Sequence, residues 1–204
     1  MIDALENIKN RISANFFDPS HKLTNEEIVE LVKYAQEAPS SFNMQNWRVI
    51  VFASAEEKEK LKKLAFGQDK VADAAAAFLF VGNKEGYKKL PTMMQPAVSA
   101  GALKAEDLAK LLAGANASYE GNDQRQRDEA IRSCSLAAMT LMLASQAKGY
   151  ASGPMIGFDP KGVEQLAGLE PNEVPAILVV VGRAAAGNRP RKPRLPVQVQ
   201  LAIR

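Results

Sequence analysis

The spacing of apolar residues changes along the chain between a helical period and short continuous runs, which predicts a mixture of helices and strands. Continuous runs predict three buried strands, at 48–53, 76–81 and 175–181. A helical period predicts helices at 2–10, from Thr24 to just before Pro39, at 55–65, at 123–148 and at about 161–167. Because no repeat or linker divides the chain, we expect one α+β domain over residues 1–204.

Polar residues at the helix starts support these boundaries. The stretch TNEE at 24–27 is a capping box, in which a threonine hydroxyl and a glutamate carboxylate satisfy backbone amides at the start of a helix. Ser54 precedes a second acidic pair, Glu56 and Glu57, in the same way. Acidic side chains there stabilise the positive end of the helix dipole. We therefore interpret both pairs as helix starts and not as an acid–base pair.

Three segments have weaker patterns. Residues 85–125 contain Pro91 and Pro96 and predict an excursion of short helices. Residues 151–159 are rich in glycine and proline and predict a loop. Residues 197–201 alternate between apolar and polar after a basic arm, which predicts a strand that pairs with the sheet of another subunit.

The helix expected at 123–148 is apolar nearly all round from Cys134 to Ala147, and it is rich in alanine and serine. A helix of this composition is typically buried, and its small side chains let other backbones approach closely. We interpret it as core or dimer packing. Trp47 is likewise interpreted as a core residue that anchors the strand after it.

The composition excludes several kinds of chemistry. With one cysteine, Cys134, and one histidine, His21, the chain has no intramolecular disulfide and too few ligands for a Cys/His zinc site, so no metal is expected. The net charge of +3 is too small to argue for nucleic acid. The first residues lack the apolar core of a signal peptide, and no run approaches the ~20 apolar residues of a membrane span. A cytoplasmic location without membrane contact is expected.

Polar residues in loops form three candidate binding sets: Arg11, Ser13 and Asn15; Ser40, Ser41, Asn43 and Gln45; and the basic segment from Arg183 to Arg194. Arginine and hydroxyl groups suit a phosphate, and side-chain amides suit the edge of a heterocycle or a polyol. Each set also has a plainer interpretation, as a solvated connection, a turn and a solvated tail. No aromatic residue interleaves the basic segment, so stacking on RNA is not indicated. The chain also lacks GxGxxG and GxxxxGK[ST].

In combination these motifs resemble the nitroreductase family of FMN-dependent reductases that use NAD(P)H. RISAN at 11–15 resembles the family's Arg-x-Ser-x-(Arg/Lys) signature, and APSSFNMQ at 38–45 resembles its APSxxNxQ loop. GYASGPMIGF at 149–158 resembles its third, glycine- and proline-containing segment. RDEAIR at 127–132 and PMIGFD at 154–159 resemble stretches of the bacterial NAD(P)H nitroreductase subgroup. Any one motif is weak, but three in the family's order are specific.

The resemblance implies an α+β, nitroreductase-like fold with a central, mostly antiparallel sheet flanked by helices. It also implies an intertwined homodimer that exchanges its C-terminal strand and holds two FMN molecules at the subunit interface. The residues it implies for FMN binding are Arg11, Ser13, Asn15, Pro39, Ser40, Ser41, Asn43, Gln45, Gln68, Lys70, Pro154, Met155, Ile156, Gly157, Arg191, Lys192 and Arg194.

The resemblance also divides these residues by role. Arg11, Ser13, Lys192 and Arg194 would hold the phosphate, with Arg191 as a substitute. The loop from Pro39 to Asn43 would reach the flavin from the partner subunit. Gln68 and Lys70 would reach the pyrimidine side of the ring, and the backbone of residues 154–157 would line it near N5.

The implied activity is hydride transfer from NADH or NADPH, through flavin N5, to a nitroaromatic or a quinone by a ping-pong mechanism. The flavin carries the chemistry, so no catalytic side chain is required. Ser41, Phe42 and Tyr119 are the candidate substrate contacts, with Phe66 as a further candidate. The alternatives are another reduction on the same scaffold (of a flavin, an ene or a halogenated substrate), a non-catalytic FMN-binding or sensing protein, and a binding module without flavin.

Overall fold

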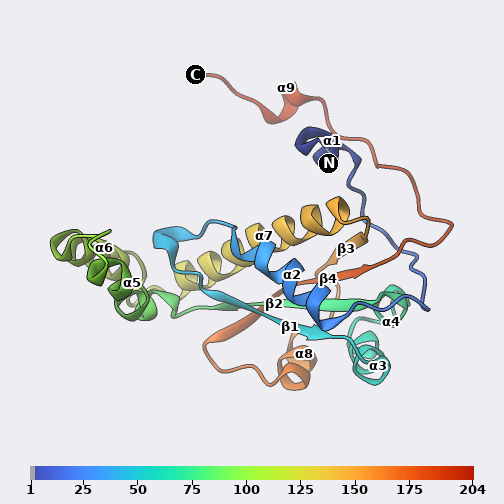
Figure 1. Cartoon of the computed structure of the whole chain (residues 1–204), viewed down its shortest axis with the longest axis horizontal. Coiled ribbons are helices and arrows are strands. Elements are labelled where there is room, and N and C mark those ends of the chain that lie inside the picture. Colours follow the sequence, from blue (N-terminus) through green and yellow to red (C-terminus); the bar gives the residue numbers. More distant parts are fainter. Residues whose placement is uncertain (1–2) are drawn as a thin grey trace.

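The computed structural model describes residues 3–204, and its centre is a four-stranded antiparallel sheet (Figure 1). In spatial order the strands are β1 (Trp47–Phe52), β2 (Ala76–Asn83), β4 (Glu173–Gly182) and β3 (Ala151–Met155). Every neighbouring pair runs antiparallel. The three predicted strands are confirmed as β1, β2 and β4, with ends shifted by at most two residues.

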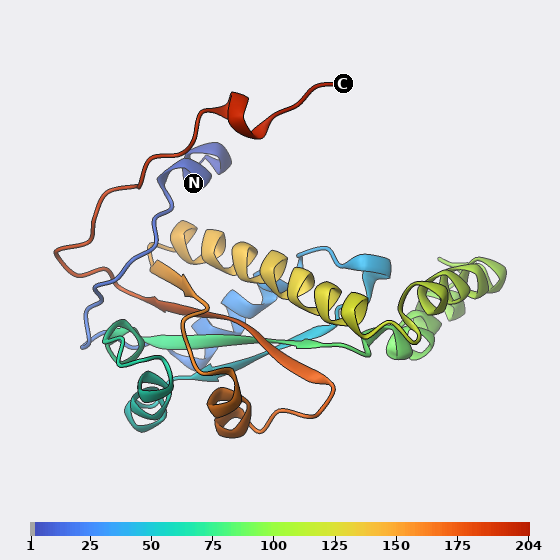
Figure 2. The ribbon, with the colours of Figure 1, turned by 180° about the vertical axis from the view of Figure 1, so that it is seen from behind.

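Helices cover both faces of this sheet (Figures 1 and 2). On one face lie α2 (Asn25–Gln36) and α7 (Asp123–Ala147), and on the other lie α3 (Ala55–Leu64), α4 (Lys70–Asp73) and α8 (Pro160–Ala167). Side chains of β2 alternate between the two resulting cores. Phe78 and Phe80 face α2 and α7, whereas Leu79 and Val81 face α3, α4 and α8. A strand buried on both faces has a continuous apolar sequence, as this one does.

The predicted helix starts are confirmed. Thr24 Oγ1 accepts a hydrogen bond from the Glu27 amide at 3.2 Å, and the Glu27 carboxylate accepts one from the Thr24 amide at 2.7 Å, which completes the capping box of α2. Ser54 caps α3 through the Glu57 amide. These polar groups therefore satisfy helix ends, as interpreted from the sequence.

The long helix α7 and Trp47 also lie as interpreted. Cys134 is buried in the core between α7 and the sheet, although Leu136 and Met139 on the outer side of the helix remain exposed. Trp47 packs against the same core, with its ring 5.8 Å from that of Phe80.

The prediction of a loop at 151–159 is wrong for its first half, because Ala151–Met155 forms β3. This strand pairs with β4 on one side, and on the other side, within residues 3–204, Ser13 makes only an isolated bridge to it. Pro154 is tolerated because an edge strand does not need every backbone donor. Local glycine and proline signals were therefore outweighed by pairing with a distant strand.

The prediction of a strand at 197–201 is wrong for this chain, in which Val197–Gln200 forms one helical turn, α9. Within residues 3–204 this segment pairs with no strand of the sheet, and the apolar side chains of the tail from Leu195 to Ile203 are exposed. At the other end, the helix predicted at 2–10 is α1 (Ala4–Asn10), and residue 2 lies outside the described residues. The tail passes over α1 before it ends (Figure 1).

Short helices occupy most of the segment at 85–125 for which a helical excursion is predicted. They are the 3₁₀ helix η2 (Gly86–Lys89), α5 (Leu90–Ser99) and α6 (Ala105–Tyr119). These helices extend beyond one end of the sheet (Figure 2) and enclose an apolar cluster of their own. Met44, which lies in the serine-rich loop at residues 39–45, is part of that cluster.

Candidate ligand-binding site

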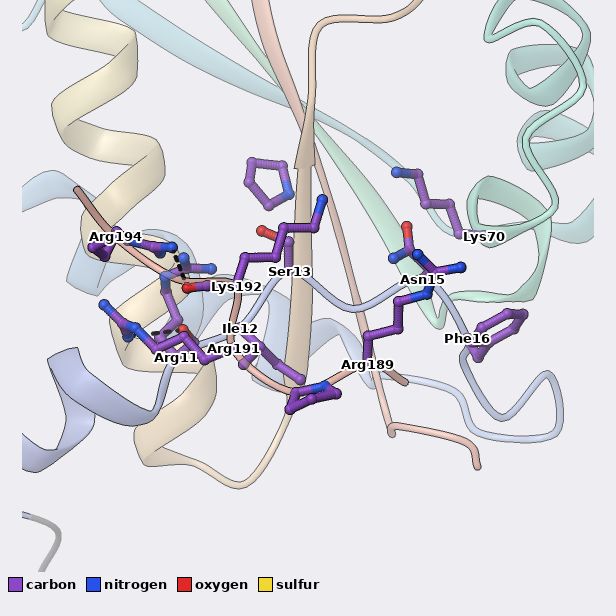
Figure 3. A pocket seen from close by; sticks show the side chains of 12 residues that line it. Arg11, Ile12, Ser13, Asn15, Phe16, Lys70, Arg189, Arg191, Lys192 and Arg194 are labelled. Carbon is purple, nitrogen blue, oxygen red and sulfur yellow. Dashed lines mark hydrogen bonds between the residues drawn. The ribbon is translucent and has the colours of Figure 1, made fainter. Parts of the chain in front are cut away.

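A basic pocket with a volume of about 490 Å³ lies between the N-terminal segment, the edge strand β3 and the C-terminal tail (Figure 3). Its lining residues are Arg11, Ile12, Ser13, Asn15, Phe16, Lys70, Pro154, Arg189, Pro190, Arg191, Lys192 and Arg194. Six of them are arginine or lysine and none is acidic. A site with this charge is suited to an anion with more than one negative charge.

The N-terminal wall of the pocket is held against β3. Ser13 forms a parallel bridge with Ser152, and the Ala14 amide donates to the Ser152 carbonyl at 2.9 Å. Gly153 permits this approach, because a Cβ atom at that position would lie 2.6 Å from the Ala14 carbonyl oxygen. The glycine thus lets the segment from Arg11 to Asn15 lie beside Pro154. It brings the first sequence motif, at 11–15, next to the third, at 149–158.

The tail wall is held by Asn188, which the sequence analysis missed. Its Oδ1 accepts hydrogen bonds from the amides of Asn15 at 2.8 Å and Phe16 at 3.2 Å, and its Nδ2 donates to the Phe16 carbonyl at 2.8 Å. The preceding Gly187 has a φ of 96° and makes the turn. The Gly-Asn pair is a turn signal that could have indicated this residue.

Arg191 is used mainly by the protein itself. Its Nη1 donates to the carbonyls of Ile8 at 2.9 Å, Arg11 at 3.2 Å and Lys9, which lie at the C-terminal end of α1. A cation is favourable there because the carbonyls carry the negative end of the helix dipole. The structure therefore places Arg191 as a link between the tail and α1, whereas Lys192 extends into the pocket (Figure 3).

Two of the lining cations are partly desolvated in the pocket. Burial, together with Arg191 and Arg194, lowers the pKa of the half-buried Arg11. Within residues 3–204, its buried Nη1 has no hydrogen-bond partner. Burial also lowers the pKa of Lys70, which enters the pocket from α4. A bound anion would offset the desolvation of both groups, so the residues present fit a phosphate.

The serine-rich loop forms a second cluster of predicted site residues. Ser41–Asn43 makes a single 3₁₀ turn, η1, and Ser40 Oγ accepts a hydrogen bond from the Gln45 amide at 2.8 Å. Phe42, Asn43 and Gln45 all have positive φ, at 52°, 55° and 45°. Non-glycine residues in this region are strained, and such strain is concentrated at functional sites. Pro39, Asn43 and Gln45 are exposed.

This loop and the basic pocket lie at opposite ends of the sheet. The loop leads into Trp47, which pairs with Gly82 at the end of β2, whereas α4 leads into Ala76 at its start. At about 3.3 Å per residue, the two ends are roughly 20 Å apart. One chain therefore does not bring the two clusters together (Figure 1).

The remaining predicted cofactor residues lie near the pocket but outside its lining. Gln68 Nε2 donates to the Gly157 carbonyl and to the Ala65 carbonyl, both at 2.9 Å, which joins the segment before α4 to the end of β3. The Met155 side chain is buried in the core, so only its backbone is available to a ligand. The Ile156 side chain is exposed.

The three candidate substrate residues do lie together. Tyr119 Oη donates to Ser41 Oγ at 2.9 Å, and the rings of Phe42 and Tyr119 meet edge to face at 6.2 Å. Tyr119 itself is buried in the cluster of the helical excursion. Phe66, the further candidate, is exposed in the connection between α3 and α4, at the pocket end of the molecule.

Residues 3–204 contain neither a cluster of metal ligands nor a membrane-spanning helix. Histidine, cysteine, aspartate and glutamate side chains do not gather there in a group of three that could hold a metal ion. No helix in this range has both the length and the apolar character needed to cross a membrane.

Comparison with known proteins agrees with this arrangement. The family model described as "Nitroreductase family" matches residues 8–183, which include all three sequence motifs and the whole sheet. The chain belongs to the nitroreductase family. The fold expected from the resemblance, an antiparallel sheet flanked by helices, is confirmed as well.

Individual members of the nitroreductase family are similar over nearly the whole chain. "Putative NAD(P)H nitroreductase MhqN" of Bacillus subtilis is 32% identical over 93% of each chain. A crystal structure of an Exiguobacterium sibiricum protein in complex with FMN has a TM-score of 0.91 and 29% identity, covering 100% of this chain and 98% of the other. "CLA biosynthesis enone reductase" of Lactiplantibacillus plantarum is 28% identical over 86% of this chain and 83% of its own length.

Proposed function

We propose that this protein is an FMN-dependent oxidoreductase that uses NADH or NADPH, with the FMN phosphate in the basic pocket. The observation that carries the proposal is the pocket itself, with six cations, no acidic lining residue and the unpartnered Nη1 of Arg11. A phosphate dianion satisfies such a donor set through charge-assisted hydrogen bonds. The FMN complex of the Exiguobacterium sibiricum protein supports the identity of the ligand.

Different lining residues are assigned to different parts of FMN. Arg11, Lys192 and Arg194 supply charge to the phosphate, and Ser13 supplies a hydroxyl donor. Lys70, which enters from the opposite side of the pocket, is assigned to the pyrimidine side of the ring together with Gln68 (Figure 3). When bound, FMN accepts a hydride from the nicotinamide donor and passes it to an acceptor, so the protein's part is to bind and orient.

We further propose that the active form is a homodimer. The loop at 39–45 lies at the end of the sheet opposite the pocket, so a second copy is needed to bring it to the flavin. The exposed apolar side chains of the tail and an open groove of about 520 Å³ between α1, α2 and α7 leave apolar surface for that copy to cover. Exchange of the tail between subunits would bury both surfaces. Each subunit would then be one FMN-binding unit spanning residues 1–204.

For the acceptor we propose a nitroaromatic or a quinone, reduced in a ping-pong cycle in which the oxidised nicotinamide leaves before the acceptor binds. Ser41 and Phe42 of the partner's loop would contact the acceptor, with Tyr119 holding Ser41 in place. The second candidate is reduction of an enone. It is favoured by the similarity to the Lactiplantibacillus plantarum protein whose name states that activity.

The test is the visible spectrum of the purified protein without oxygen, before and after NADH or NADPH and then after a quinone, a nitroaromatic or an enone. A flavin band near ~450 nm that bleaches with the donor and returns with an acceptor supports the reductase, and the acceptor that restores it identifies the class. A flavin that stays oxidised with both donors indicates storage or sensing. No FMN bound, even after addition, contradicts the proposal. Light scattering of the same sample decides whether it is a dimer.

A further inference from the structure

Lys58 is a buried lysine outside the pocket that no role described above explains. It lies on α3 and is 1% exposed. Its Nζ donates to the Ala72 carbonyl at 2.8 Å and to the Ala74 carbonyl. Within residues 3–204 it forms no ion pair with a carboxylate. Burying an ammonium group costs considerable free energy, so its presence calls for a specific task.

The two carbonyls that Lys58 binds lie at the C-terminal end of α4 and in the turn that leads to β2. A cation there interacts favourably with the negative end of the helix dipole. The helix α4 has only four residues, Lys70–Asp73, and helices this short are not stable without outside contacts. Lys58 therefore supplies a contact on which the position of α4 depends.

A second lysine of α3 holds the other end of α4. Lys62 lies one helical turn after Lys58, so the two side chains leave the same face of α3. Lys62 Nζ pairs with the carboxylate of Asp69, the residue before α4, at 2.7 Å. The short helix is thus tied to α3 at both of its ends.

We propose that Lys58 and Lys62 are positioning residues that hold α4 so that the amino group of Lys70 stays in the ligand pocket. The inference rests on the proposed function in that it takes FMN as the ligand. Lys70 shares its pocket with five other cations, and no carboxylate lines that pocket to pair with it. Burial desolvates its ammonium group, so on a mobile segment Lys70 would turn toward solvent. Fixing its backbone from α3 keeps the side chain available without placing an acidic residue in the site.

The first measurement concerns the protein without FMN. Amide hydrogen exchange in residues 68–75 reports how firmly α4 is held. We expect K58M and K62M each to raise exchange in this segment, with the larger rise in K58M. The matched control is K60M, since Lys60 lies on the same helix but pairs with Glu56 and Glu57 and not with α4. K60M is expected to leave exchange in residues 68–75 unchanged.

The second measurement is the affinity for FMN, by titrating FMN into the flavin-free, full-length wild type, K70M, K58M and K58M/K70M. Loss of one charge-assisted hydrogen bond weakens binding by about tenfold to a hundredfold, which we expect for K70M. K58M is expected to lose most of the same factor, because it acts through Lys70. The double variant is expected to bind no more weakly than K70M, the signature of two residues that act as a unit.

Distinct results would overturn the inference. If K58M weakened FMN binding by the same factor with and without the K70M substitution, Lys58 would act on the whole fold and not through Lys70. If K58M and K62M both bound FMN with wild-type affinity, neither lysine would position Lys70. If K58M does not fold, the cycle of K62M with K70M decides in the same way, because Lys62 is partly exposed and its partner Asp69 is exposed. A wild type that binds no FMN would instead contradict the proposed function, while the exchange rates would still show whether the two lysines hold α4.

Discussion

Tyr119 donates a hydrogen bond to Ser41 Oγ at 2.9 Å and so connects the last residue of α6 to the strained turn within the serine-rich loop. The helical excursion is therefore not independent of the candidate site, although it extends beyond the sheet. Tyr119 is buried, while Ser41 is half-buried and accessible from outside. The excursion supports the loop from within, and the loop presents the polar surface.

We expect Y119F to loosen this loop without disturbing the core around it. The ring stays in place against Phe42 and Tyr87, and only one hydrogen bond is lost. The free energy of unfolding should fall by about 1 kcal/mol, and KM for the acceptor should rise about twofold to tenfold. S41A should raise KM at least as much, because it also removes the proposed contact with the acceptor, and Y119F/S41A should behave like S41A alone. An unchanged KM in Y119F would mean that Tyr119 only packs.

Replacing Gly153 should affect stability and binding together. In G153A the new Cβ would lie 2.6 Å from the Ala14 carbonyl oxygen, which is backbone and has little freedom to move. We expect a loss of about 2 kcal/mol in the free energy of unfolding and weaker FMN binding, because the segment that carries Arg11 must move away from β3. Urea unfolding and an FMN titration measure the two effects.

The control for that change is G157A. Its Cβ would lie 3.4 Å from Nε2 of Gln68, the tip of a flexible side chain that can shift. We expect a change of less than about 0.5 kcal/mol in stability. If G153A were as mild as G157A, the close approach of Ala14 to β3 would not be needed to build the pocket.

Arg191 and Lys192 should have separable effects although they are adjacent. R191M removes the hydrogen bonds to the carbonyls at the end of α1, so the free energy of unfolding of the FMN-free protein should fall by about 0.5–1 kcal/mol. K192M removes a cation that points into the pocket, so it should weaken FMN binding without lowering that stability. The loss in K192M should shrink as salt is raised, since salt screens the charge. Reversed behaviour of the two variants would contradict the assigned roles.

Much of the fold could be predicted from the sequence because its signals are local. The capping box at 24–27 and the apolar runs of β1, β2 and β4 specify their elements within a few residues of chain. The strand β3 could not be predicted in this way, since Gly153 and Pro154 indicate a loop locally. It becomes a strand only through pairing with Val180 and Val179 on β4.

In the candidate site, too, some residues could be predicted from the sequence and others depend on tertiary structure. The family resemblance implies Arg11, Ser13 and Lys192 as phosphate contacts, and all three line one pocket. Lys58 could not be found, because a lysine among charged neighbours on α3 has the sequence appearance of a solvated position. Its burial depends on the packing of α4 against α3, and that tertiary contact cannot be inferred from the local sequence. The separation of the serine-rich loop from the pocket is likewise a property of the topology.

The ion pair between Arg48 and Glu173 should make stability depend on pH. Arg48 on β1 reaches across β2 to the start of β4 and donates to both carboxylate oxygens of Glu173, at 2.7 and 2.8 Å. These hydrogen bonds hold the pKa of Glu173 below its ordinary value of 4.5, against the opposing effect of burial. A carboxyl with a lowered folded-state pKa contributes stability above its unfolded value, and that contribution is lost as pH falls through the folded value.

E173Q should therefore be less stable than the wild type at pH 7, by about 1–2 kcal/mol, since Arg48 is half exposed and screened by solvent. The difference should shrink as pH falls below 4.5, because protonation of Glu173 then removes the same charge from the wild type. Urea unfolding at a series of pH values measures it, with E56Q as the control, whose carboxyl pairs only with Lys60 at the surface. A difference between wild type and E173Q that stays constant down to acid pH would show that shape, and not the charge on Glu173, accounts for the loss.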